Sequence, residues 1–179
     1  MARRLTVMGV VLLGLITPPG IAAYVTGPAR GEGWQDIAWP FPRDGWPPGR
    51  AYRCPAASCG TEMELYVRPK IGFCNCDSGV ADDDEVDRVA DLDLISPRFR
   101  ALQAGEVVRI ADMTGRIRHY QFGDGSQRQG VGMVVSRKCD LMVAVVQGRA
   151  SPLELQREAL DHLASQKTKG WIMSAMRGG

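Results

Sequence analysis

Four short β-rich segments follow one another between residues 106 and 146, and they constrain the fold of the chain more than any other feature. No more than eight residues separate one segment from the next, and the separating residues include Gly, Asp and Lys. Connections of this length join antiparallel strands, because a parallel crossover needs a dozen or more residues. We therefore predict an antiparallel meander with strands at 106–111, 116–122, 131–136 and 141–146.

The last of these segments, 141–146, is apolar on both faces, which is typical of a central strand covered by helices. Two further β-type patterns, at 50–54 and 61–67, predict a hairpin that precedes the meander. We expect Thr114 and Gly115 to form the turn between the first two meander strands.

Two helices are indicated by their end signals. Asp82 is a suitable N-cap, the acids that follow it match the positive end of a helix dipole, and Pro97 ends the helical pattern. Ser151 and Glu154 have the spacing of a capping box with Pro152 between them, so a second helix begins there, and Gly170 is predicted to break it. The predicted fold class is therefore α+β, an antiparallel meander packed with two main helices.

The order hairpin, helix, meander and long C-terminal helix, with Gly115-Arg116 in a turn and Tyr120 following, resembles the α/β/α sandwich of the PsbP/Mog1 type. The stretch 67–76, with the sequence VRPKIGFCNC, is similar to one in small exported bacterial proteins of unassigned function. These resemblances imply a sandwich fold and an extracytoplasmic location, and they imply no particular activity.

Residues 1–23 have the layout of a secretory signal peptide: a short basic start, an apolar run at 5–16 and helix breakers at 17–20. The apolar run of about a dozen residues is shorter than the ~20 that a membrane-spanning helix needs, and Ala22 and Ala23 are suitable residues for cleavage. The alternative is an uncleaved N-terminal anchor in the inner membrane. Both readings predict that the remaining chain is periplasmic or otherwise extracytoplasmic.

Residues 24–49 are rich in Pro, Gly and Trp and predict an extended lead-in that forms neither a helix nor a central strand. Four large aromatic side chains of this segment are costly to leave in water, so we expect them to pack on the domain surface or over a sheet face. A groove for a Pro-rich or aromatic ligand is the alternative. The aromatic residues are Trp34, Trp39, Phe41 and Trp46. Residues 50–179 are predicted to form a single α+β domain.

The charge balance argues against nucleic-acid binding. The chain has 22 basic and 20 acidic residues, and the basic ones include Arg3 and Arg4 of the predicted signal, so a mature chain would be nearly neutral. The sequence also has no nucleophile elbow, P-loop or dinucleotide fingerprint. We therefore predict no catalytic residue and favour a non-enzymatic protein.

Five cysteines are the residues best suited to carry chemistry, and in an oxidising compartment their usual fate is a disulfide. Cys54 and Cys59 flank the turn of the predicted hairpin, where a bridge between them has a suitable geometry. Cys74 and Cys76 are two residues apart, so a bridge between them would be strained and open to thiol exchange. We favour the alternative in which one of them, assigned as Cys76, pairs with Cys139.

The odd number of cysteines leaves at least one thiol over, which supports a second hypothesis. Cys74, Cys76 and Cys139 could form a thiol site or supply sulfur ligands to copper(I). A structural zinc site would want paired Cys-x2-Cys steps, which are absent, and the acids after Asp82 do not match a calcium loop, because Asp87 stands where that loop needs Gly. No cofactor is expected under the first hypothesis.

Two functions are thus open. The first is an exported, disulfide-stabilised accessory or binding protein of the cell envelope, with another envelope protein as its partner. The second is a thiol-dependent redox or copper-handling protein that uses the Cys74/Cys76 loop. The partner of Cys139 distinguishes them, because a bridge to a loop cysteine removes the third sulfur.

Overall fold

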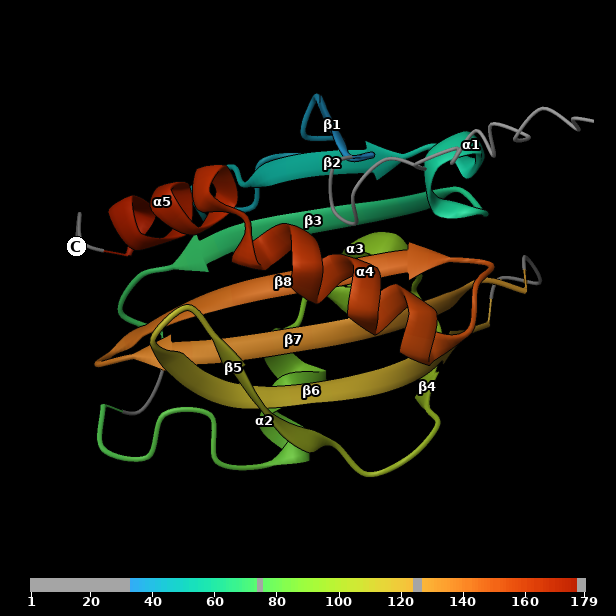
Figure 1. The fold of residues 1–179 in the computed structure, drawn as a ribbon. Helices are drawn as coiled ribbons and strands as arrows, with labels where there is room; N and C mark the ends of the chain where they lie inside the picture. The colour runs from blue at the N-terminus through green and yellow to red at the C-terminus, as the bar shows by residue number, and fades with distance from the viewer. Residues whose placement is uncertain (1–32, 74–75, 124–126, 177–179) are drawn as a thin grey trace, which may run out of the picture.

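An eight-stranded antiparallel sheet forms the middle layer of the protein (Figure 1). The computed structural model describes residues 33–73, 76–123 and 127–176, so the predicted signal or anchor and Cys74 lie outside the described residues. The strand order is β1-β2-β3-β8-β7-β6-β4, and β5 pairs with β6. The strands are β1 (Gln35–Ile37), β2 (Arg50–Cys54), β3 (Met63–Lys70), β4 (Phe99–Ala101), β5 (Glu106–Ile110), β6 (Met113–Phe122), β7 (Gln129–Arg137) and β8 (Asp140–Gly148).

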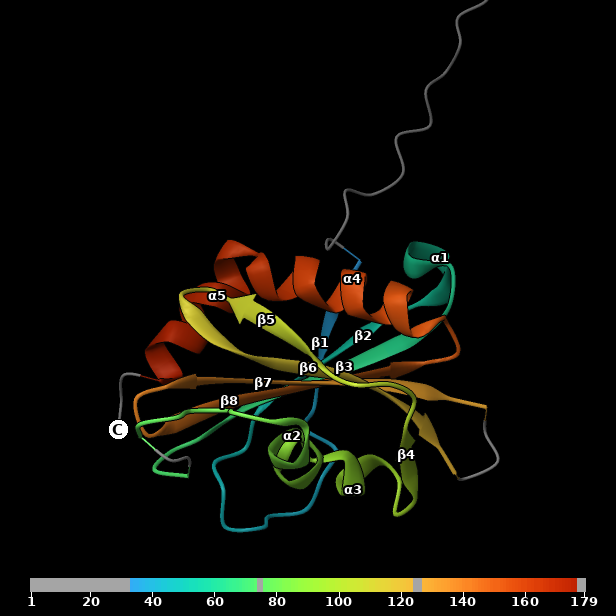
Figure 2. The ribbon, with the colours of Figure 1, turned by 90° about the horizontal axis from the view of Figure 1, so that it is seen from below.

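Helices cover both faces of the sheet, which makes the α/β/α sandwich that the order of elements predicted (Figure 2). One face carries α4 (Pro152–Ala164) and α5 (Gln166–Ala175), and the other carries α2 (Asp83–Val89) and α3 (Leu92–Ile95). A short helix, α1 (Ala56–Cys59), lies between β2 and β3. The predicted α+β class is confirmed, and β8 is the central strand that its doubly apolar pattern indicated.

Strand alternation divides the buried apolar side chains into two clusters. Leu65 and Val67 of β3 point with Met142 and Ala144 of β8 into the cluster beneath α4 and α5. The intervening residues of β8, such as Val143, point into a smaller cluster beneath α2 and α3. On β3, however, the residues on that second side are polar, and this difference creates the site described below.

The helix starts follow their capping signals. The Asp82 side chain accepts a hydrogen bond from the backbone of Glu85, and Ser151 forms the predicted capping box with Glu154. The predicted break at Gly170 is wrong, because α5 continues through this residue. The long helix ends instead at Ser165, whose side chain caps the start of α5.

The predicted turn at Thr114 and Gly115 is also wrong. The chain turns at Ala111 and Asp112, with Ala111 in the left-handed region, and Gly115 lies within β6. A Cβ atom at Gly115 would collide with the carbonyl oxygen of Val134 on the neighbouring strand, so the glycine permits close strand packing rather than a turn.

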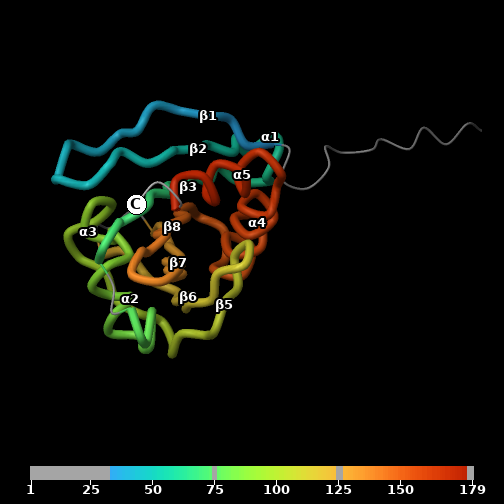
Figure 3. Tube along the Cα trace, turned by 90° about the vertical axis from the view of Figure 1, so that its left-hand side faces the viewer, coloured from blue at the N-terminus to red at the C-terminus, as the bar shows by residue number. Residues whose placement is uncertain are grey.

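Residues 33–49 of the Pro/Trp-rich segment lie along one edge of the sheet (Figure 3). Its residues 35–37 form the edge strand β1, which the sequence did not reveal. Trp34 packs with Tyr52 in the cluster under the C-terminal helices, whereas Trp39 lies on the opposite face. Within the described part of the chain, no helix is both long and apolar enough to cross a bilayer.

Helix α4 offers a matched pair of leucines that tests the packing. Leu155 is fully buried and Leu153, two residues earlier, is 70% exposed. We expect Leu155→Ala to lower the free energy of unfolding by about 3 kcal/mol, because it leaves a cavity in the core. Leu153→Ala should change it by less than about 0.5 kcal/mol. Urea unfolding with the disulfides intact measures both, and equal effects would contradict the described register of α4.

Candidate functional site: an aromatic pocket over buried ion pairs

The β1–β2 connection covers the face of the sheet beside α3. Trp39 and Phe41 both meet the ring of Tyr66 on β3 edge to face, with centroids 6.2 and 4.8 Å away. Leu94 and Ile95 of α3 border the same rings. Trp39 and Phe41 therefore pack over a sheet face, as predicted for the aromatic side chains of this segment.

Arg68 and Lys70 of β3 lie beneath this cover and are nearly fully buried. The Arg68 guanidinium donates two hydrogen bonds to Asp44 at 2.7 and 2.9 Å and two to Asp91 at 2.6 and 2.8 Å. Lys70 Nζ lies 2.6 Å from Asp91 and donates to the carbonyl oxygen of Val89. Two cations and two carboxylates thus neutralise one another, which burial of such charges requires.

The ion pairs shift the pKa values of Arg68 and Asp44. Burial by itself lowers the pKa of Arg68, but the hydrogen bonds to Asp91 and Asp44 outweigh it and raise this pKa above its ordinary value. The hydrogen bonds from Arg68 hold the pKa of Asp44 below its usual value of 3.8. Both groups therefore remain charged around neutral pH.

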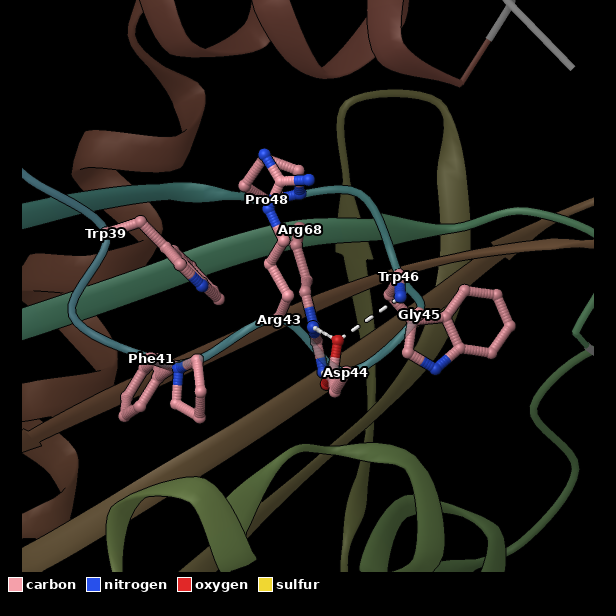
Figure 4. A pocket seen from close by; sticks show the side chains of 9 residues that line it. Trp39, Phe41, Arg43, Asp44, Gly45, Trp46, Pro48 and Arg68 are labelled. Atoms are coloured by element: carbon pink, nitrogen blue, oxygen red, sulfur yellow. Dashed lines mark hydrogen bonds and ion pairs between the residues drawn. The ribbon is translucent and has the colours of Figure 1, made fainter.

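A cavity of about 260 Å³ opens between the aromatic segment and this cluster (Figure 4). Its walls are rings and prolines together with the charged groups of three residues. Arg68 and Asp44 are paired with each other, whereas Arg43 forms no ion pair within the described part of the chain. The lining residues are Trp39, Phe41, Pro42, Arg43, Asp44, Gly45, Trp46, Pro48 and Arg68. The pocket can therefore accept an apolar ring and offers one cation to its ligand.

Trp46 connects the pocket to the loop that follows β3. Its ring meets the ring of Phe73 edge to face at 5.2 Å. Lys70 Nζ lies 5.9 Å from the centre of the Trp46 ring and 5.4 Å from that of Phe73. This wall of the pocket thus depends on where the loop holds Phe73.

Two disulfides bracket β3. Cys54 pairs with Cys59 across α1, and Cys76 pairs with Cys139, which ties the loop after β3 to the turn between β7 and β8. Both bridges support folding in an extracytoplasmic, oxidising compartment. Because Cys139 is bridged to a loop cysteine, it is not available as the third sulfur of the thiol or copper hypothesis. Cys74, the other member of that hypothesis, lies outside the described residues.

The remaining candidate ligands are not gathered into a site. Among the described residues, no three His, Cys, Asp or Glu side chains come together in an arrangement that could hold a metal ion. Methionine sulfur can also bind copper(I), but the four strand methionines Met63, Met113, Met133 and Met142 all belong to the buried cluster beneath α4 and α5. His119 bonds Gln156 and His162 bonds Thr168, and both are buried.

Sequence reasoning missed the ion-pair cluster. The alternation of β3 was visible up to Val67, and its extension through Arg68 to Lys70 was the available signal. Pro69 argued against that extension, because a proline within a run of residues argues against a central strand. It is tolerated because β2 stops pairing at Val67, leaving β3 bonded there only to β8.

No protein-family model matches the sequence, and no curated protein matches it. Among solved structures, the chain resembles the solution structure of cyanobacterial PsbP (CyanoP) from Synechocystis sp. PCC 6803, with 15% identity and a TM-score of 0.45. The match covers 74% of this chain and 79% of that chain. The predicted likeness to the PsbP type is thus present as a weak structural resemblance.

Removing the shared carboxylate tests the cluster. Asp91→Asn should lower the free energy of unfolding by about 3 kcal/mol, because it leaves Arg68 and Lys70 buried with one carboxylate fewer. Asparagine tolerates the left-handed backbone of Asp91, so the change isolates the charge. Asp93→Asn, an exposed neighbour, should stay within about 0.5 kcal/mol. Chemical denaturation measures both variants, and equal stabilities of the two would contradict the cluster.

Acid should weaken the same cluster through Asp44. Because its pKa is lowered in the folded state, its stabilising effect is complete above the unfolded value of 3.8 and is lost as pH falls through the folded value. Unfolding measured from pH 6 downward should therefore show a shallower acid decline for Asp44→Asn than for the wild type. Asp112→Asn, at an exposed turn, should keep the wild-type slope. Parallel curves for wild type and Asp44→Asn would refute this role.

Proposed function

We propose that this protein is an exported, disulfide-stabilised, non-enzymatic accessory protein of the cell envelope that binds a segment of another envelope protein. The observation that carries this proposal is the pocket of Trp39, Phe41 and Trp46 above the neutralised cluster. The pocket is open, lined by rings and held by the ion pairs that the buried Arg68 makes with Asp44 and Asp91. Preformed apolar pockets with a few placed polar groups are the usual form of a binding site.

The proposed place of action is the periplasm. The two disulfides support an oxidising compartment, and residues 1–23 would deliver the chain there as a cleaved signal or hold it at the inner membrane as an anchor. A binding role is favoured over copper handling or thiol catalysis by the Cys74/Cys76 loop, because in the oxidised protein Cys139 is bonded to Cys76 and is not a third free sulfur.

The pocket also suggests the chemistry of the bound segment. Aromatic walls with adjoining prolines suit an extended chain that presents a proline or aromatic ring. Arg43 adds an exposed guanidinium without an ion-pair partner among the described residues, and guanidinium groups bind carboxylates in a bidentate manner. We therefore propose that the partner segment places a carboxylate, from an acidic residue or a chain end, next to such a ring.

A pair of small probes tests this proposal: N-acetyl-prolyl-phenylalanine and its C-terminal amide. In a titration of the ¹⁵N-labelled mature chain, the acid should shift the indole signals of Trp39 and Trp46 and leave that of Trp34, on the other face, unchanged. The acid should bind about fivefold more tightly than the amide, which corresponds to ~1 kcal/mol for one charge-assisted contact.

Two variants separate the charge from general effects. Arg43→Gln should remove the preference for the acid, whereas Arg109→Gln, at an exposed position of β5, should retain it. If neither probe shifts the signals of Trp39 and Trp46, or if acid and amide bind equally to the wild type, the proposed ligand chemistry is wrong.

A further inference from the structure

The two disulfides differ in their exposure to solvent. Cys54 is fully buried, and Cys59 is half-buried and packs against the large apolar cluster. Cys76 is exposed and Cys139 is only half-buried, at the tip of the β7–β8 hairpin. Thiol–disulfide exchange requires an attacking thiolate to reach one sulfur along the axis of the bond, so accessibility determines which bridge reacts. Cys76–Cys139 is the reactive bridge by this criterion.

The exposed bridge also holds the loop that supports the pocket. Cys76 is three residues beyond Phe73, whose ring contacts Trp46. The same loop is fastened by a second contact to the hairpin, a hydrogen bond of 2.7 Å from the Gly72 amide to Asp140. Phe73 is 37% exposed, so the body of the protein holds it only in part. Reduction of the disulfide removes the covalent link between the loop and the hairpin, whereas the hydrogen bond from Gly72 to Asp140 can remain.

We infer that Cys76–Cys139 is a thiol-exchange site for a dithiol reductant of the envelope, and that its reduction loosens the Trp46 wall of the pocket. The consequence for binding rests on the proposed function. In the reaction, a thiolate of the dithiol attacks one sulfur of the bridge, forms a mixed disulfide and releases the other cysteine as a thiolate. The second thiol of the reductant then displaces the first cysteine. Two electrons and two protons pass to Cys76 and Cys139, and the dithiol leaves as a disulfide.

In this reaction the protein is the target of thiol–disulfide exchange and not its catalyst. The Cys54–Cys59 bridge, with Cys54 fully buried, keeps the β2–β3 connection closed during the reaction, and the ion pairs of Arg68 still hold Asp44 and Asp91. The expected change is therefore confined to the loop after β3 and to the ring of Trp46, while the sheet and both helical layers remain folded.

The first experiment determines which of the two disulfides is reduced at the lower concentration of reductant. The folded mature chain is titrated with dithiothreitol, the free thiols are alkylated, and the modified cysteines are identified by mass spectrometry. Cys76 and Cys139 should be alkylated at a reductant concentration at least tenfold lower than Cys54 and Cys59. Equal sensitivity of both bridges, or earlier reduction of Cys54–Cys59, would overturn the exchange site.

The second experiment measures the consequence on the selectively reduced protein and on the variant Cys76→Ser/Cys139→Ser. Both should shift the indole signal of Trp46, leave that of Trp34 in place, and bind N-acetyl-prolyl-phenylalanine at least threefold more weakly than the oxidised protein. The reduced wild type supplies the answer if the double variant fails to fold. An unchanged Trp46 signal after reduction would overturn the coupling.

The two proposals fail in different ways. If the oxidised protein does not bind the probe, the proposed ligand chemistry is wrong, yet the alkylation order and the Trp46 signal still decide the exchange site. If the oxidised protein binds and reduction alters neither the Trp46 signal nor the affinity, the proposed function stands and this inference does not.

Discussion

The burial of Arg68 and Lys70 on β3 organises one whole face of the protein. Two cations placed side by side in a sheet and removed from water require nearby carboxylates, because an unpaired buried charge is strongly destabilising. The carboxylates come from two separate covering elements: Asp44 from the Pro/Trp-rich segment and Asp91 from the junction of α2 and α3. The cluster therefore fastens both elements to the sheet and places the aromatic pocket where they meet.

The two faces of the sheet are consequently built by different means. Beneath α4 and α5, apolar side chains of β3 and β8 pack in a continuous cluster, and the hydrophobic effect suffices. On the other face, the apolar cluster ends at β8, and the polar side of β3 takes over with Glu64, Tyr66 and Arg68. Protein cores are close-packed with few voids, and the pocket lies outside both apolar clusters, between the aromatic covering segment and Arg68.

Strand β3 is further secured at both ends by disulfides. Cys54–Cys59 closes the short connection that leads into it, and Cys76–Cys139 joins the loop that leaves it to the turn of the neighbouring β7–β8 hairpin. The first bridge contains the fully buried Cys54, whereas the second contains the exposed Cys76, three residues beyond the Phe73 ring that contacts Trp46. The proposed regulation of binding derives from this difference between the two bridges of one strand.

The sequence by itself determined the α+β class, the antiparallel meander, the central position of β8 and the starts of α2 and α4, because local periodicity and capping residues specify these features. It misplaced the turn at Gly115 and the break at Gly170, since a glycine can serve close packing or sit in a helix as well as end an element. Tertiary structure alone decided that Asp44 and Asp91 meet Arg68, residues 24 and 23 positions away, and that Phe73 supports Trp46. Such contacts depend on how distant segments cross the sheet, and no local pattern in the chain records them.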